Sequence, residues 1–445
     1  MNDNTQGKVH PVDEVLPFPR LIMLGLQHVL AMYAGAVTVP LVLAGALGLS
    51  KETTAFLISA DLFAGGIVSI IQALGVGIFG IRYPLMMGVT FVSIGPMIAI
   101  GMNPELGLNG IFGTIMAAGV IAFLLAPLMS RLVHFFPPVV TGSVILLIGV
   151  TLMGVGVIYS GGGYGNAEFG SPVYIGIALF VLLVTILFNR YGKGLLSSIS
   201  VLLGIVAGFI LTAALGMVDM DGLSEASWFA LVLPFHFGMP KFDVLAILSM
   251  TLVMVVTMIE TMGGIFAVGD IIGKKPSEND LKRGLRTDGL GALIGGIFNT
   301  FPYTTYSQNI GLVYVSGIHS RFVCVAAGII MILLGLIPKL SVIVASIPHY
   351  VLGGAMIVMF GMVAANGIRI LQDVDFRDNR HNLMTVAVSL GVGMIPMVSD
   401  KFFAKFPADV GTLLNSGIAL CAISAIVLNY LANGKPAKPA APPRQ

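Results

Sequence analysis

Apolar runs long enough to cross a lipid bilayer recur along almost the whole 445-residue chain. About 20 residues of helix cross the roughly 30 Å hydrocarbon core of a membrane. Runs of this kind extend from about Leu21 to Leu431, separated by short polar or charged connections. Charged residues make up only 10% of the chain, against about 25% in soluble domains. This pattern predicts an all-α protein that crosses the membrane many times.

We place fourteen candidate spans along the chain. They lie near residues 19–47, 54–74, 83–103, 110–130, 136–158, 172–189, 196–217, 243–270, 285–300, 303–318, 322–338, 345–367, 382–398 and 411–433.

The lysines and arginines test this count, because cytoplasmic loops carry the excess of positive charge. If the N-terminus is cytoplasmic, the inner segments hold 18 of these residues and the outer segments hold five. An even number of spans with both termini in the cytoplasm is therefore predicted. The net charge of +2 reflects this topology and does not indicate nucleic-acid binding.

Two further features exclude other kinds of site. The two cysteines, Cys324 and Cys421, both fall within predicted spans, where a thiol usually packs as a small apolar group. We therefore expect no disulfide, no metal site and no bound cofactor. The proline-rich tail, residues 434–445, contains few apolar residues and is expected to be disordered.

Two of the predicted spans, near 83–103 and 303–318, are interrupted by proline, glycine, β-branched and aromatic residues. Irregular backbone at membrane depth is tolerated only where protein buries it or where it lines a cavity. Interrupted segments at corresponding positions of two halves indicate the binding site of a transporter. Each half holds seven spans, an odd number, so the second repeat must be inverted. The alternative is that both segments are proline-kinked helices that only pack closely.

Ionisable residues inside spans are costly and are first considered functional. Glu260 has no basic residue within a helical turn, so it is a candidate for substrate binding or proton coupling; a hydrogen bond to a broken neighbouring helix is the structural alternative. Asp288 follows Arg286 closely, and an interfacial ion pair is equally open. His28 suits either transport or a structural hydrogen bond. Asp61 is left without a role.

The strongest polar group of residues lies in the second interrupted segment, where Tyr306, Ser307, Gln308 and Asn309 follow one another. Side-chain amides both donate and accept hydrogen bonds, which suits a flat neutral heterocycle. Phe91, in the matching segment, is placed to stack on such a ring. No catalytic motif or soluble domain is present, so neither an enzyme nor a receptor is expected.

Taken together, these motifs resemble the nucleobase-ascorbate transporter family, also called the nucleobase-cation symporter 2 family. The family signature reads here Gln308-Asn309-Ile310-Gly311, followed by Ser316-Gly317 in which serine replaces the usual threonine. The Gln27-His28 pair, the Gly88-x-Thr-Phe motif, Glu260 and Asp288 occur in the order expected for the family. The resemblance covers nearly the whole chain.

The resemblance implies fourteen spans in two inverted seven-span repeats, with short β-strands in broken spans 3 and 10. A core domain would comprise residues 1–130 and 243–338, and a gate domain residues 131–218 and 339–433. The core would move against the gate as an elevator. Members are usually homodimers embedded in membrane lipid, and bacterial members lie in the inner (plasma) membrane.

The resemblance also implies roles for individual residues. Glu260 and Gln308 would bind a purine directly, with Phe91 stacking on it and Ser307 and Tyr306 beside it. Asn309, Asp288, Glu260 and, less directly, His28 would be required for transport or proton coupling.

Two positions bear on the branch of the family. Uracil-type members have glutamate at position 308 and histidine four residues after the span 8 glutamate, where this chain has Gln308 and Gly264. We therefore expect a secondary active, proton-coupled importer of xanthine and/or uric acid. A permease for uracil or another nucleobase, and an anion transporter of the same architecture, are the alternatives.

Overall fold

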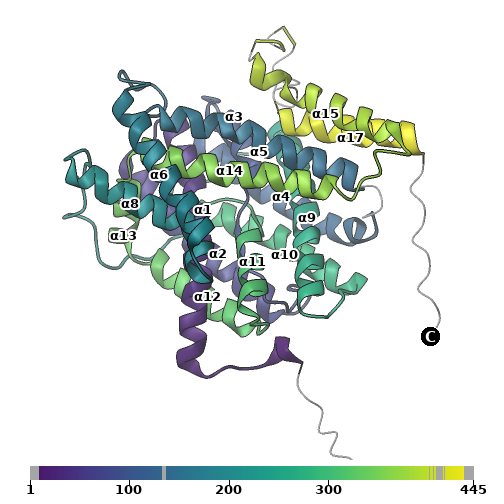
Figure 1. Cartoon of the computed structure of the whole chain (residues 1–445), viewed down its shortest axis with the longest axis horizontal. Helices are drawn as coiled ribbons and strands as arrows, with labels where there is room; N and C mark the ends of the chain where they lie inside the picture. The colour runs from purple at the N-terminus through teal and green to yellow at the C-terminus, as the bar shows by residue number, and fades with distance from the viewer. Residues whose placement is uncertain are drawn as a thin grey trace, which may run out of the picture.

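The structure is a computed structural model that describes residues 10–132, 137–399, 401–403, 405–406, 414 and 416–434. Apart from Gly434, the predicted disordered tail lies outside these residues. Helices dominate, and the elements follow the chain in the order η1 (Pro11–Asp13), α1 (Phe18–Leu47), α2 (Lys51–Leu74), β1 (Met87–Val89), η2 (Phe91–Ser93), α3 (Ile94–Gly101), α4 (Gly107–Leu132), α5 (Pro138–Ser160), α6 (Pro172–Tyr191), α7 (Leu195–Ser198), α8 (Ser200–Ala214), α9 (Val244–Ile271), α10 (Glu278–Ile297), β2 (Tyr303–Thr305), α11 (Ser307–Ser316), α12 (Phe322–Gly335), α13 (Pro338–Ala345), α14 (His349–Leu371), α15 (Arg380–Val398) and α17 (Gly417–Asn433) (Figure 1).

Many of these helices are long and apolar enough to cross a membrane. Within the described residues eight helices meet that condition, or up to nine if α12 and α13, bent by 81°, are taken as one span. The fold is therefore that of a mostly helical, multi-pass membrane protein.

The bounds of two elements differ from the sequence expectation. Helix α10 begins at Glu278, before the span expected from residue 285, because Ser277 and Asp280 form a capping box that starts the helix in polar sequence. Helix α13 was not expected; it begins at Pro338, which suits the first turn of a helix.

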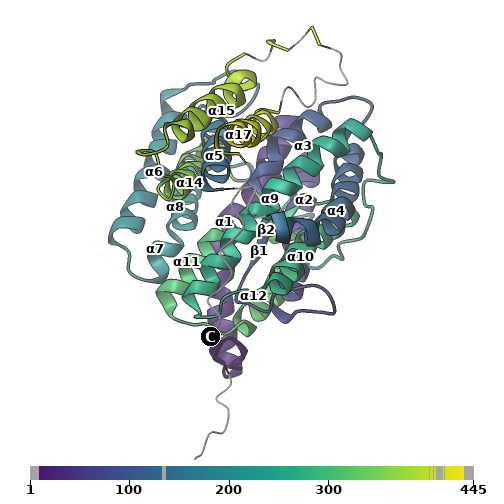
Figure 2. The same cartoon turned by 90° about the vertical axis from the view of Figure 1, so that its right-hand side faces the viewer.

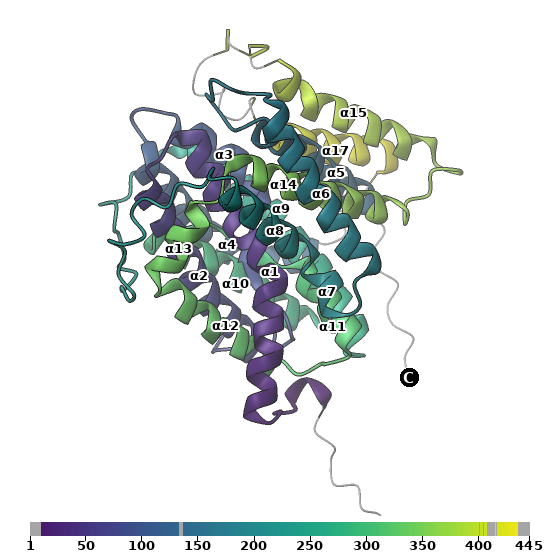
Figure 3. The same cartoon turned by 60° about the vertical axis from the view of Figure 1, so that its left-hand side comes forward.

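The helices form two groups. Helices α1, α2, α4, α9, α10 and α12 pack on one another around β1 and β2, and we call them the strand-containing bundle (Figure 2). Helices α5, α6, α8, α14, α15 and α17 pack on one another and form the second bundle (Figure 3). Helix α9 contacts α17, and α1 contacts α8 and α14, so the bundles meet along α1 and α9.

The two strands lie inside the strand-containing bundle, and all six of their residues are buried. They pair antiparallel, with Met87 opposite Thr305 and Val89 opposite Tyr303. Beyond the strands, the Thr90 N–H donates to the Pro302 carbonyl at 3.0 Å, and the Tyr306 N–H donates to the Met86 carbonyl at 3.0 Å. The interrupted backbone is thereby satisfied within the protein, as membrane depth requires.

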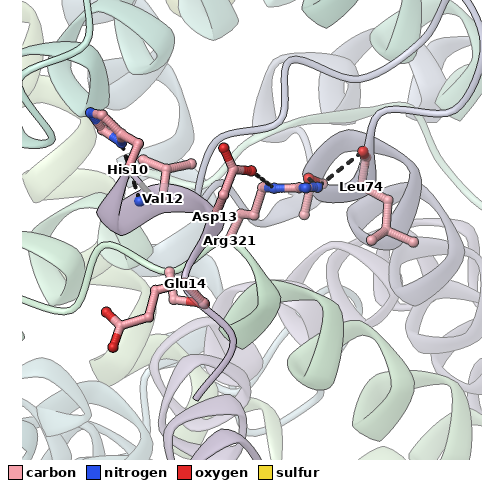
Figure 4. A network of polar contacts seen from close by, with 8 residues as sticks. His10, Val12, Asp13, Glu14, Leu74 and Arg321 are labelled. Atoms are coloured by element: carbon pink, nitrogen blue, oxygen red, sulfur yellow. Dashed lines mark hydrogen bonds and ion pairs between the residues drawn. The ribbon is translucent and has the colours of Figure 1, made fainter. Parts of the chain in front are cut away.

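The N-terminal segment before α1 is tied to the strand-containing bundle through Arg321. Its guanidinium donates to the Asp13 carboxylate at 2.7 Å and to the Leu74 carbonyl, at the end of α2, at 3.1 Å (Figure 4). The Ser320 hydroxyl donates to the Glu14 carbonyl at 2.6 Å. Arg321 therefore joins three segments at the end of the bundle where α1 begins.

Candidate functional site

Each of the two strands leads into a short helical segment. Strand β1 leads through Thr90 to Phe91, and β2 leads through Tyr306 to Ser307 and Gln308. Because the strands are antiparallel, these segments leave the ribbon from its opposite ends. The first backbone N–H groups of a helix have no partners within it, and its N-terminus carries partial positive charge. Donors and positive potential therefore gather at the ribbon.

Tyr306 fills the space between the ribbon and α1. Its ring lies against Gly88 and its hydroxyl against Gly35, so closely that a Cβ at either glycine would overlap it. Tyr306 is only 3% exposed, and its hydroxyl has no hydrogen-bond partner within the described residues. The predicted binding residue Tyr306 thus forms a buried wall behind the ribbon.

Phe91 lies between this wall and the second bundle. Its ring is 6.4 Å from that of Tyr306, centroid to centroid, and 5.5 Å, edge to face, from Phe360 of α14. Phe91 is partly exposed, whereas Phe360 is buried. One part of the Phe91 ring remains free for a ligand, and the contact with Phe360 joins the two bundles at the site.

Ser307 and Gln308 present polar groups at the start of α11. Ser307 is exposed and Gln308 is half-buried, and the Ser307 hydroxyl donates to the Gln308 Oε1 at 3.3 Å. Tyr306, at the N-cap, supplies no side-chain hydrogen bond to the helix. The Gln308 Nε2 and the first backbone N–H groups of α11 can therefore donate to a ligand.

Glu260 enters the site from α9, which packs against β2, η2 and α11. Its side chain is partly exposed, and within the described residues no lysine or arginine forms an ion pair with it. A carboxyl group without a cationic partner can accept hydrogen bonds from a ligand or take up a proton. Glu260, Gln308 and Phe91 are thus partly accessible and lie on elements that pack around the ribbon.

Asp288 lies deeper, on α10, and is fully buried. Its carboxyl faces Glu260 and the Thr261 hydroxyl, although neither oxygen has a hydrogen-bond partner at normal distance within the described residues. The alternative of an interfacial pair with Arg286 is wrong, because the Arg286 guanidinium lies over the Phe123 ring, 5.5 Å from its centroid. Thr261 also contacts the Thr304 hydroxyl at 3.1 Å, so it separates Asp288 from β2.

His28 and Asn309 contact each other, away from the accessible part of the site. The Asn309 Nδ2 donates to the His28 carbonyl at 2.9 Å and lies 3.0 Å from the His28 Nδ1. Both residues are buried. The pair connects α1 to α11, so the His28-Asn309 contact has a structural function.

Asp61 is a functional candidate to which the sequence assigned no role. Its carboxylate accepts hydrogen bonds from Tyr303, the first residue of β2, and from Thr300. An acidic residue inside an apolar span was the only signal, and these partners lie 242 and 239 residues away in the sequence.

A small cavity, with a volume of about 20 Å³, lies between α9, α5 and α17. Its walls are mainly aliphatic and include Val144, Val256, Ile259 and Ala422. The polar candidate residues do not line it. An apolar, incompletely filled boundary therefore separates the two bundles next to Glu260.

Comparison with known proteins identifies the family. Residues 19–402 match the model of the family Xan_ur_permease, described as a permease family. The chain belongs to the nucleobase-ascorbate transporter family of permeases. It is a membrane transport protein and not an enzyme.

Several curated relatives align over nearly their full length. The uric acid transporter UacT of Escherichia coli (strain K12) is 55% identical over 97% of this chain and 90% of its own. The xanthine permease of Bacillus subtilis (strain 168) is 42% identical over 94% of each chain. The uric acid permease PucJ of the same organism is 41% identical over 92% of each.

Solved structures share the fold at low sequence identity. The transmembrane domain of the cyanobacterial bicarbonate transporter BicA is similar with a TM-score of 0.60 and 15% identity, over 94% of this chain and 98% of that domain. SLC26A9 is similar with a TM-score of 0.60 and 12% identity, over 94% of this chain and 66% of that one. These likenesses describe the architecture alone.

Proposed function

We propose that this protein is a secondary active transporter that imports xanthine, uric acid or both. The observation that carries the proposal is that α9, η2 and α11, which bear Glu260, Phe91 and Gln308, pack around the paired strands and leave all three side chains partly accessible. The relatives named as uric acid and xanthine transporters, at 41% to 55% identity, support this substrate class.

The chemistry of the three side chains matches an oxidised purine. Such a purine is flat and carries ring N–H donors beside carbonyl acceptors. The Glu260 carboxylate accepts from ring N–H groups, and the Gln308 amide pairs with one donor and one acceptor on the purine edge. The Phe91 ring stacks on the purine face. Ser307, exposed beside Gln308, adds one further hydroxyl.

A proton is the proposed coupling ion, and Glu260 is its proposed carrier. Glu260 has no ion pair within the described residues. The buried Asp288 lies near Glu260 and Thr261, and the Thr261 hydroxyl contacts Thr304 of β2. Protonation of Glu260 on substrate binding would remove an uncompensated charge before the site moves. Sodium-independent uptake that rises as external pH falls supports this step, and strict sodium dependence overturns it.

The movement is proposed to be an elevator-like displacement of one bundle against the other. In this proposal the fourteen spans form two inverted repeats, the strand-containing bundle is the mobile core, and the second bundle is the gate. The aliphatic cavity at their boundary supports sliding, because few polar contacts would have to break there. The proposed protein is a homodimer in the bacterial inner membrane, with both termini in the cytoplasm.

One hydrogen bond joins the two bundles directly. The Tyr159 hydroxyl of α5 donates to the Leu41 carbonyl of α1 at 2.8 Å. The predicted topology places both residues towards the outer face. We infer that this hydrogen bond must break when the two bundles move against each other.

Uptake of radiolabelled uric acid and xanthine by bacterial cells that lack their own purine permeases tests the function. We expect the wild-type protein to accumulate at least one of the two purines, Glu260→Gln to abolish uptake, and Gln308→Ala to raise KM strongly while leaving a measurable rate. Glu52→Gln, an exposed carboxyl in the first turn of α2, is the matched control and should retain wild-type uptake.

Uptake of labelled uracil, chloride and sulfate by the same cells separates the alternatives. Accumulation of uracil without either purine would replace the proposed substrate class with a pyrimidine. Saturable transport of chloride or sulfate without purine uptake would show an anion transporter. Either result sinks the proposed function.

A further inference from the structure

Asp61 lies in the middle of α2 and is 2% exposed. The Tyr303 hydroxyl lies 3.0 Å from the Asp61 Oδ1 and 3.1 Å from the Asp61 carbonyl oxygen. The Thr300 hydroxyl donates to the same Oδ1 at 3.3 Å. One carboxyl oxygen thus receives hydroxyl groups from the start of β2 and from the turn before it.

These contacts hold β2 on the side that faces α2. Tyr303 is fully buried, and its ring packs among Ala64, Val68 and Met87. Gln308 follows Tyr303 after only four intervening residues. A shift of Tyr303 along its strand would therefore carry the first turn of α11 with it.

The same face of α2 also holds β1. The Ser69 hydroxyl accepts from the Met87 N–H at 2.9 Å and donates to the Met87 carbonyl at 3.1 Å. Asp61 and Ser69 are eight residues apart, a little more than two helical turns, so they lie on one broad face of α2, roughly 80° apart around its axis. Helix α2 fixes one strand through Ser69 and the other through Asp61.

A short ribbon depends on such supports. Each strand has three residues, and an isolated two-stranded hairpin of even ordinary length is at best marginally stable. A displacement well below the length of a hydrogen bond is enough to misplace a binding group. The position of Gln308 therefore depends on what anchors β2.

We propose that Asp61 is a positioning residue for purine binding: through Tyr303 and Thr300 it holds β2, and with it Gln308, in the geometry that reads the purine edge. The inference rests on the proposed purine transport. The property required of Asp61 is a hydrogen-bond acceptor at Oδ1, which asparagine also supplies, and not a negative charge.

The test measures KM and maximal rate of uric acid and xanthine uptake, with membrane protein amount measured for every variant. Asp61→Ala and Tyr303→Phe should each raise KM roughly 3- to 10-fold, as the loss of a buried hydrogen bond predicts. Asp61→Asn should stay within about twofold of wild type, because its amide oxygen still accepts.

Ser59→Ala is the matched control on the same helix. Ser59 is buried and hydrogen-bonded at 2.8 Å to Ser341 of α13, away from the strands. Its loss should leave KM unchanged, whereas a general weakening of α2 would raise KM in the control as well.

A double-mutant cycle with Gln308 tests the positioning function itself. If Asp61 acts through Gln308, Asp61→Ala should raise KM little further in a Gln308→Ala background. Additive effects would overturn the proposal, as would an unchanged KM in Tyr303→Phe or a defect in Asp61→Asn equal to that of Asp61→Ala.

Two outcomes separate this inference from the function on which it rests. If cells that make the wild-type protein take up no purine, the proposed function is refuted, and the positioning proposal with it. Wild-type uptake with an unaltered KM in the variants would refute the positioning proposal alone. If Asp61→Ala does not reach the membrane, Tyr303→Phe, which keeps the buried ring, decides.

Discussion

The two interrupted segments share one ribbon but use it differently. In the first, the Thr90 hydroxyl accepts from the Val92 N–H and the Thr90 carbonyl accepts from Ser93, so the backbone there is satisfied locally. In the second, the Tyr306 carbonyl accepts from the Asn309 N–H at 3.2 Å, but the Tyr306 side chain supplies no bond to the first turn of α11. The exposed Ser307 and half-buried Gln308 follow it.

This difference separates shape from hydrogen bonding in the site. The first segment supplies close packing through Gly88 and an aromatic face through Phe91. The second supplies donors and acceptors. Changes in the first segment should therefore act through packing, and changes in the second through polar contacts, which the following predictions test.

The largest effect is expected for Gly88→Ala. The added Cβ would overlap the Tyr306 ring, and overpacking of about 1–3 kcal/mol corresponds to a factor of roughly 5 to 150. Uptake per transporter in the membrane should fall by more than about tenfold, measured as initial rate with quantified protein. In Gly95→Ala, the control in the same segment, the new Cβ meets nothing within 4 Å. Equal losses in both variants would contradict the packing account.

An intermediate effect is expected for Asn309→Ala in the second segment. The change removes the bonds from Nδ2 to His28, and a net value of about 0.5–1.5 kcal/mol per bond predicts a loss of roughly tenfold for the pair. Initial uptake rates and thermal unfolding of the purified protein measure it. Asn189→Ala, whose side chain is exposed, serves as control. Wild-type uptake in Asn309→Ala would show that the tie between α1 and α11 is dispensable.

The smallest effect is expected for Phe91→Leu, which keeps apolar bulk and removes the aromatic face. Aromatic pairs contribute about 0.5–1.5 kcal/mol beyond their buried area, so KM for uric acid should rise roughly threefold with little change in maximal rate. Phe229→Leu, at a ring 63% exposed, is the control and should leave KM unchanged. A fall in maximal rate alone would assign Phe91 to the contact with Phe360 and not to the substrate.

The strength of sequence prediction varied along the chain for physical reasons. Where an apolar run is continuous, the expected bounds agree closely with the structure: 19–47 became Phe18–Leu47 and 243–270 became Val244–Ile271. Bounds were less accurate where polar capping or a proline decided them, as in α10 and α13. The fourteen-span count stays a prediction, because helices such as α3 and α11 are too short to cross a membrane alone and do not show which spans they complete.

The sequence by itself determined the class of protein and the two interrupted segments, since hydropathy and proline or glycine in an apolar run act over short distances along the chain. It also singled out Glu260, Gln308 and Phe91. Only the tertiary structure decided what each polar group contacts. The Tyr303 hydroxyl donates to Asp61, and the Asn309 amide donates to the His28 carbonyl. The Arg286 guanidinium lies over the Phe123 ring and not beside Asp288. The physical reason is that a hydrogen bond forms between groups close in space, and these partners on α2, β2, α1 and α11 are brought together only when the helices pack.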